Sequence, residues 1–423
     1  MDLGGGFADF DLELEDFEVK KTGSCINRLL SVGSGGSILS VAEVKDGIVY
    51  FQSADTYIYA LNCKNGEVVW RFKTDGIMAG NSPEVHGDTV YAGNLNGSMY
   101  ALNAKTGKGI WKFKAGKGIT VKALYYNERV YFVSLDGNLY CVDASTGKEI
   151  WRFRTGKGIY YSPSENNGKI YFASLDGNAY CLDWETGKEI WKFKAGDEIQ
   201  CEMPSKVYNG RIYFASMDNK VYSLNAETGQ ETWRFGTGKY GNCFAPVVHG
   251  KYVFHASRDG VLYALSLEGK EIWRFRTGGP VGLGVLIQKG RVYFGSEDGN
   301  IYCLKMENGK NIWNFKTGGP TWNPPTGYEN KLYFGSWDCH FYCIDLKGKE
   351  IWRFATSDKT ICKVDPPYKV FEVVVKKEET EEEKEGNRYD LDLSGRIDGS
   401  EYNVKSEYAI GSVYLEEKKY GEE

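Results

Sequence analysis

The sequence has few prolines, few histidines and no long apolar run. Its 423 residues include 10 Pro and 4 His, and no stretch approaches the ~18 apolar residues of a membrane span. The net charge of −5 comes without the basic stripe that nucleic-acid binding usually needs. The acidic start of the chain lacks the basic residues and apolar core of a signal peptide. We therefore expect a cytoplasmic monomer that binds neither nucleic acid nor membrane.

What the chain has in excess is a repeat rich in glycine and aromatic residues. A Trp followed by Lys, Arg or Asn and then by Phe recurs eight times, at intervals of 39 to 42 residues. Recurrence at this period indicates a solenoid or a propeller. The eight positions are Trp70, Trp111, Trp151, Trp191, Trp233, Trp273, Trp313 and Trp352.

The fourth copy, residues 170–193, shows what each unit encodes. Its aromatic and β-branched runs predict strands, and Asp176-Gly177 is a dipeptide typical of a tight hairpin turn. One further strand precedes each unit, at 205–208 in the fifth copy. Four short antiparallel strands per ~40 residues describe a propeller blade. The sequence therefore predicts an all-β, eight-bladed propeller of four-stranded antiparallel blades.

Three further expectations follow from the repeat. No unit is divided between the two ends of the repeat region, so blades one and eight should meet directly. Each repeat Trp should pack in the core between neighbouring blades. The residue after the repeat Tyr is always small, which predicts buried, reduced thiols where it is Cys, without disulfides. This position holds Ala60, Ala101, Cys141, Cys181, Ser223, Ala264, Cys303 and Cys343.

The phrase of residues 170–193 resembles the pyrroloquinoline quinone (PQQ) repeat, and this resemblance extends over most of the chain. That family includes quinoprotein alcohol dehydrogenases and non-enzymatic propellers such as the lipoprotein of bacterial outer-membrane assembly. The dehydrogenases carry two adjacent Cys over the cofactor and have loops inserted between blades, and this chain has neither. We therefore expect a non-enzymatic protein without PQQ. The alternative is a PQQ-dependent or other oxidoreductase of the quinoprotein type.

A binding site is expected where the loops between blades reach one mouth of the central channel. Uniform loops would suffice for structure, so loop residues that differ between blades are the candidates. The predicted function is a binding scaffold that presents this mouth to a protein partner or a small ligand. A channel merely plugged by side chains is the rival interpretation. The candidates are Lys122, Tyr160, Tyr161, Glu202, Met203, Cys243, Phe244, Trp322, Asn323 and Trp337.

The two ends do not belong to the repeat. Residues 390–401 resemble the calcium loop of EF-hand and dockerin proteins, which wraps six to eight oxygen ligands around the ion. We expect a structural calcium site there, with an acidic surface turn as the alternative. Its ligands would be Asp390, Asp392, Ser394, the carbonyl of Arg396, Asp398 and Glu401. The predicted divisions are an extension with an acidic strand (1–38), the propeller (39–354), a strand with a charged linker (355–389), and the calcium-loop-like segment with a Tyr-rich tail (390–423).

Overall fold

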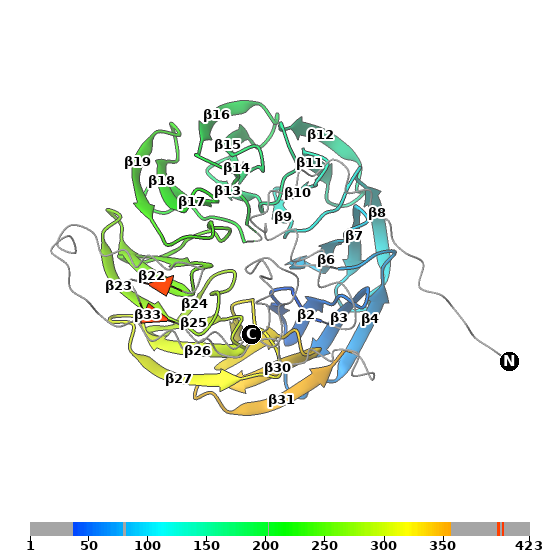
Figure 1. The fold of residues 1–423 in the computed structure, drawn as a ribbon. Coiled ribbons are helices and arrows are strands. Elements are labelled where there is room, and N and C mark those ends of the chain that lie inside the picture. Colours follow the sequence, from blue (N-terminus) through cyan, green and yellow to red (C-terminus); the bar gives the residue numbers. More distant parts are fainter. Residues whose placement is uncertain (1–36, 79–81, 202, 357–395, 398–399, 402–423) are drawn as a thin grey trace, which may run out of the picture.

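The computed structural model describes residues 37–78, 82–201, 203–356, 396–397 and 400–401. Eight antiparallel sheets stand around a common axis in chain order, as the blades of a propeller (Figure 1). No helix occurs among these residues. The eight-bladed, all-β fold predicted from the repeat is therefore confirmed.

The strands of each blade pair with their neighbours in sequence. Blades one to three contain β1 (Glu43–Lys45), β2 (Ile48–Gln52), β3 (Tyr57–Asn62), β4 (Val68–Lys73), β5 (Glu84–His86), β6 (Thr89–Gly93), β7 (Ser98–Asn103), β8 (Gly109–Lys114), β9 (Leu124–Tyr126), β10 (Arg129–Val133), β11 (Asn138–Asp143) and β12 (Glu149–Arg154). Blades four to six contain β13 (Ser164–Asn166), β14 (Lys169–Ala173), β15 (Asn178–Asp183), β16 (Glu189–Lys194), β17 (Arg211–Ser216), β18 (Lys220–Asn225), β19 (Glu231–Gly236), β20 (Val247–His249), β21 (Tyr252–Ala256), β22 (Val261–Ser266) and β23 (Glu271–Arg276). Blades seven and eight contain β24 (Leu286–Gln288), β25 (Arg291–Gly295), β26 (Asn300–Lys305), β27 (Asn311–Lys316), β28 (Thr326–Tyr328), β29 (Lys331–Gly335), β30 (His340–Asp345) and β31 (Glu350–Ala355).

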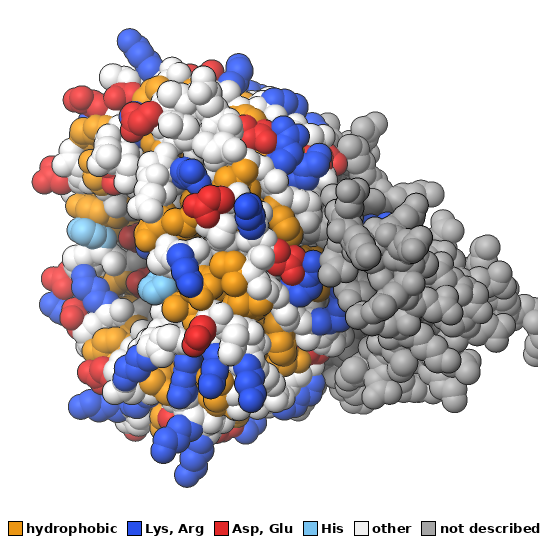
Figure 2. Space-filling model, turned by 90° about the vertical axis from the view of Figure 1, so that its left-hand side faces the viewer, with side chains coloured by type: hydrophobic (Ala, Val, Ile, Leu, Met, Phe, Trp, Pro, Cys, Tyr) orange, Lys and Arg blue, Asp and Glu red, His pale blue; other side chains and the backbone are white. Residues whose placement is uncertain are grey.

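Burial within a blade follows the order of the strands from the axis to the rim. In blade four the short β13 is partly exposed, β14 and β15 are almost fully buried, and β16 at the rim is largely exposed. The residue before the repeat Trp faces solvent on most outermost strands, as at Ile272 and Ile312. Figure 2 shows apolar side chains interspersed with charged ones along one flank. The core therefore lies between blades, around their two middle strands.

The repeat Trp joins each blade to the next. Trp191 donates its indole N–H to the carbonyl of Ala226 in blade five, at 2.9 Å. Gly229 closes over the ring, and a Cβ there would lie 2.6 Å from Trp191 Cδ2. The prediction that the Trp side chains lie between blades is confirmed, but only Trp70 and Trp191 are buried. The other six remain partly exposed because they lie on the outermost strands.

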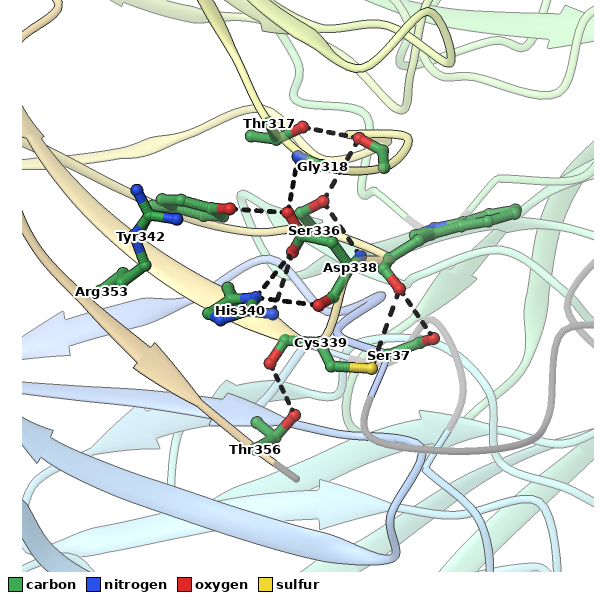
Figure 3. A network of polar contacts seen from close by, with 12 residues as sticks. Ser37, Thr317, Gly318, Ser336, Asp338, Cys339, His340, Tyr342, Arg353 and Thr356 are labelled. Atoms are coloured by element: carbon green, nitrogen blue, oxygen red, sulfur yellow. Dashed lines mark hydrogen bonds and ion pairs between the residues drawn. The ribbon is translucent and has the colours of Figure 1, made fainter. Parts of the chain in front are cut away.

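An aspartate at the hairpin turn provides a second link between blades, which we call the Asp belt. In blade eight, Asp338 Oδ2 accepts the hydroxyl of Tyr342 at 2.6 Å and the amide of Gly318 from blade seven at 2.8 Å (Figure 3). Each carboxylate thus joins its own third strand to the loop of the preceding blade. The same pair of bonds occurs at Asp136, Asp176, Asp218, Asp259 and Asp298.

The ring closes where blade eight meets blade one. The hydroxyl of Tyr333 and the indole N–H of Trp352 both donate to the carbonyl of Cys63, each at 3.2 Å. Phe51 stacks on Phe341 with ring centroids 4.3 Å apart. The prediction that these blades meet directly is confirmed. The strands expected at 9–19 and 368–376 lie outside the described residues.

The cysteines at the small position are free, and their side chains are fully buried. Burial raises the pKa of Cys141 and of Cys303 to about 11, which keeps both thiols protonated at neutral pH. Cys181 and Cys343 behave in the same way. The thiol state expected at this position is confirmed. Cys243, outside it, is disulfide-bonded, so the reduced state does not extend to every cysteine.

Blade five departs from the pattern. Its sheet has three strands, β17 to β19. The innermost strand expected at 205–208 is reduced to one isolated bridge between Tyr208 and Arg211. The loop before it is longer than in the other blades, which accounts for the 42-residue interval between Trp191 and Trp233. The prediction of a fourth regular strand is wrong for this blade.

Candidate functional site

The loops that enter the blades converge at the axis and bury most of the residues predicted to form a binding mouth. The aromatic members share one large apolar core with loop residues from blades three to eight. We call the group formed by Tyr160, Tyr161, Gln200, Cys201, Cys243, Phe244, Trp322, Asn323 and Trp337 the axial cluster; all nine side chains are at least nine-tenths buried. Seven of these nine residues were predicted, while Gln200 and Cys201 were not among the candidates. The structure buries the seven as an interior and not as an open mouth.

Two predicted residues stand apart from this group, and the placement of a third is not described. Met203 is only partly buried and packs against the same core. Glu202 lies outside the described residues. Lys122 makes ion pairs with Glu43 at 2.7 Å and Glu84 at 3.0 Å, which join the loop before blade three to the innermost strands of blades one and two. Burial disfavours its ammonium, but the two carboxylates outweigh this effect and raise the pKa of Lys122. Lys122 thus forms ion pairs that connect blades one, two and three within the protein.

Aromatic rings dominate the blade-eight side of the axial cluster. Trp322, on the loop before β28, is the largest fully buried side chain in the described part of the chain. Its ring meets Phe244 edge to face at 6.2 Å and Trp337 at 5.7 Å. Such pairs contribute roughly 0.5–1.5 kcal/mol each beyond the area they bury. These aromatic contacts therefore join the loop that enters blade six to blade eight.

Main-chain bonds join neighbouring loops around the cluster. The amide of Cys201 donates to the carbonyl of Tyr160 at 2.6 Å, and that of Leu283 donates to Trp322 at 2.7 Å. Gly282 is required beside the second bond, because a Cβ there would lie 1.8 Å from the Trp322 carbonyl oxygen. The loops thus hold the axial side chains in fixed positions.

Several buried polar side chains in this region have no hydrogen-bond partner. Within the described residues, both amide atoms of Gln200 and Asn323 and the indole N–H groups of Trp322 and Trp337 lack one. Folded proteins satisfy nearly all such groups, and an unmet one costs roughly 1–3 kcal/mol. Unpaired polar groups on several of the loops that enter the blades point to positions that something else completes, either water or a ligand.

The same absence of partners extends to two side chains that sequence reasoning missed. Thr120 lies in the loop before blade three, and its buried hydroxyl is unpaired. Gln52 ends β2, where its main chain bonds the hydroxyl of Ser40 in the axial loop of blade one. Its buried amide is also unpaired. A comparison of units could have found Gln52, since the other seven carry Gly, Ala or Val at that position.

The described residues show no metal-binding group. They contain no group of three His, Cys, Asp or Glu side chains placed to hold a metal ion. Of the six predicted calcium ligands, Arg396 and Glu401 lie in β32 (Arg396–Ile397) and β33 (Ser400–Glu401), which pair as a hairpin. The other four, Asp390, Asp392, Ser394 and Asp398, are outside the described residues. No described helix could span a membrane.

Comparison with known proteins supports the fold. The model of the PQQ_2 family, described as outer membrane protein assembly factor BamB, matches residues 27–118, 95–234, 135–274 and 258–377. The crystal structure of the computationally designed Ika8 protein superposes with a TM-score of 0.66 at 15% identity, over 74% of this chain and 98% of that one. BamB from Moraxella catarrhalis gives 0.54 at 22% identity, over 61% and 80%. No curated protein sequence matches the chain.

Proposed function

The chain belongs to the PQQ_2 family of propeller proteins, and from this premise we propose that it is a non-enzymatic binding protein that holds a small polar ligand at the axial cluster. The unpaired amides of Gln200 and Asn323 carry the proposal. Both side chains are almost completely buried, at 0% and 1% exposure. A ligand that formed hydrogen bonds with these two amides would remove the free-energy cost of leaving them buried and unpaired.

Burial favours one of the two kinds of partner that the sequence left open. A protein partner needs accessible side chains over some hundreds of Å². Tyr161 and Phe244 are 0% exposed and Trp322 is 2% exposed, so a partner protein on the outside cannot reach them. A small molecule enclosed by the loops can. We therefore favour a small ligand over a protein at this position.

The side chains present define the chemistry of that ligand. Gln200 and Asn323 each offer a carbonyl acceptor and an amide donor, while the two indoles offer donors only. Donors thus outnumber acceptors, which favours a ligand rich in carbonyl or hydroxyl oxygens. The rings of Trp322 and Phe244 suit a planar or apolar part of the same molecule. No ionised group is required of it.

Native mass spectrometry of the purified protein tests this proposal. A mass held without a covalent bond should be present in the native protein and absent after denaturation. Gln200→Leu and Asn323→Leu keep the side-chain size, remove the polar atoms and should lose that mass. Gln230→Leu, on the exposed turn between β18 and β19, is the matched control and should retain it.

The opposite result is equally specific. Replacing an unmet polar group by an apolar one of similar shape can be neutral or stabilising. If the wild-type protein holds no additional mass, and Gln200→Leu or Asn323→Leu raises the melting temperature, the cluster is ordinary packed core. The binding proposal would then be wrong.

Quinone-dependent oxidation is the competing function, and the spectrum distinguishes it. Addition of PQQ and calcium to the purified protein should leave the visible absorbance of the quinone unchanged if the protein is non-enzymatic. A shifted spectrum together with alcohol-dependent reduction of a dye would replace the proposal by the oxidoreductase alternative. The variants Gln200→Leu and Asn323→Leu would show whether such binding occurs at the axis.

We also propose that residues 390–401 bind one structural calcium ion. The spacing of Asp390, Asp392, Ser394, Asp398 and Glu401 in the sequence supports this proposal. It is independent of the axial cluster, and a titration that tests it is given in the Discussion.

A further inference from the structure

A histidine replaces the usual phenylalanine at one position between blades. In six units the fourth residue of the second strand is Phe: Phe51, Phe132, Phe172, Phe214, Phe294 and Phe334. This Phe stacks on the repeat Tyr of its own blade and meets a Phe of the preceding blade, as Phe294 does with Tyr302 and Phe275. Blade six has His255 there, in register opposite Tyr263.

The environment of His255 suits a neutral imidazole and not a charged one. It is 0% exposed, and neither ring nitrogen has a hydrogen-bond partner in the described part of the chain. Tyr263 beside it packs against Phe235 of blade five at 5.6 Å, which is the usual contact between blades. A ring whose two nitrogens are both unmet can exist here only without a charge.

Other irregularities of the ring gather at the same boundary. Blade five lacks a regular innermost strand, so fewer main-chain bonds hold its axial edge. The loop from blade five to blade six contains Tyr240 at φ +96°, a backbone conformation that costs a non-glycine residue roughly 1–3 kcal/mol. The loop before blade five contributes a sulfur acceptor, Cys201 Sγ, to the amide of Ala245 in the loop entering blade six. Sulfur is a weaker acceptor than oxygen.

We propose that the boundary between blades five and six is a pH-sensitive opening point of the ring, where protonation of His255 favours separation of the two blades. Phe244 of the axial cluster lies on the loop entering blade six, and Cys201 lies on the loop entering blade five. Separation there therefore uncovers the axial cluster. Only this consequence depends on the proposed function.

The direction of the effect follows from burial. Burial lowers the pKa of His255 from 6.5 to about 3, whereas an opened state that hydrates the ring restores the ordinary value. The stability that His255 lends to the closed state is complete above pH 6.5 and is lost progressively as the pH falls towards 3. Between pH 7.5 and 4.5 these two values predict a rise of about 90-fold in the opening equilibrium.

The charged groups around His255 do not oppose this effect. On its own blade, Tyr263 donates to Asp259, and Arg274 lies over the Tyr263 ring. Arg258 occupies the turn that follows β21. From blade five, the uncharged Phe235 packs against Tyr263, the residue opposite His255. Among the described residues no carboxylate pairs with the imidazole, and burial is the cause of its lowered pKa.

Hydrogen exchange of the full-length protein at pH 7.5 and 4.5 tests the proposal. Protection factors, corrected for intrinsic exchange, should fall by up to 90-fold more in β19 and β21 than in β11 of blade three. His255→Phe restores the residue of the other blades and should abolish this excess. Introducing Phe294→His into the His255→Phe protein should move the sensitivity to β25.

Two outcomes would overturn the proposal. One is an equal loss of protection in β11, β19 and β21 of the wild-type protein. The other is an unchanged pH dependence of β19 and β21 in His255→Phe, which would assign the effect to carboxylates. Neither outcome bears on whether the axial cluster holds a ligand, because exchange is measured without one.

Discussion

At blade two the carboxylate of the Asp belt does not come from the hairpin turn of the blade. This exception allows the contribution of the belt to stability to be tested. The hairpin turn of blade two has Asn96 where the other seven blades have Asp. The carboxylate comes instead from Asp75, in the loop leaving blade one. Asp75 accepts hydrogen bonds from Tyr100, Asn94 and Lys112, each at 2.6 Å. Asp75 therefore links blades one and two from the loop of blade one, whereas in the other links of the Asp belt the carboxylate comes from the hairpin turn of the later blade.

Removal of Asp75 should be costly because three of its donors are buried. In Asp75→Ala the hydroxyl of Tyr100, on a 6% exposed side chain, and the amide of Asn94 and the hydroxyl of Ser98, both on fully buried side chains, lose their acceptor. At about 1–3 kcal/mol for each unmet group, the loss is about 3–9 kcal/mol. The ion pair with Lys112 is exposed to solvent and adds ~1 kcal/mol at most.

Urea unfolding of three variants distinguishes the contribution of the Asp-belt hydrogen bonds to stability from the effect of simply removing a negative charge. Asp88→Ala is the control, since Asp88 pairs only with Lys105 and both side chains are about 70% exposed; it should change the free energy of unfolding by less than ~0.5 kcal/mol. Asp75→Ala, Asn96→Asp returns the carboxylate to the turn and should recover a substantial part of the loss. Equal effects of Asp75→Ala and Asp88→Ala, or no recovery in the double variant, would refute the reasoning.

The pH dependence of this contribution has a definite sign. Burial would raise the pKa of Asp75, but bonds from Lys112, Tyr100, Asn94 and Ser98 outweigh burial and hold that pKa well below 3.8. A depressed carboxyl pKa means stability that is present above the unfolded value and lost as the pH falls through the folded value. The difference between wild type and Asp75→Ala should therefore be full at pH 7 and shrink only below about pH 4.

Three further predictions concern the core, the thiols and the carboxyl-terminal segment. Trp191→Ala should lower the free energy of unfolding by ~3–5 kcal/mol in urea unfolding, because it empties the contact between blades four and five; a loss below ~1 kcal/mol would contradict that role. Cys141 should react with a thiol reagent at pH 8 far more slowly in the folded than in the unfolded protein, since burial raises its pKa to about 11; equal rates would show that the position is accessible. Calorimetric titration of metal-free protein should find one calcium site that is lost in the double variant Asp390→Ala, Asp392→Ala; no binding at millimolar calcium would leave an acidic tail.

The fold was predictable because the same turn and strand motifs recur in all eight units of the repeat. Turn dipeptides such as Asp176-Gly177 set the hairpins, and alternating aromatic residues set the buried strands. Where one unit departs from the others, the sequence alone could not predict whether a strand is kept or lost. Residues 205–208 have a strand-like composition, yet only Tyr208 keeps a bridge. The longer loop before them removes the register that the other blades share.

Whether the loop residues line an open mouth or fill an interior could not be predicted from the sequence, and the reason is geometric. Loop position predicted that Tyr161 and Trp322 lie at a channel mouth, whereas the structure buries both in one shared core. The same residue types can therefore line an open mouth or fill an interior, and their spacing in the chain is identical in both cases. What distinguishes the two is the set of unmet partners, at Gln52 and Gln200 for example, and a partner is a property of the folded chain. Substitutions that remove polarity without removing volume are consequently the variants that can tell a ligand site from a filled core.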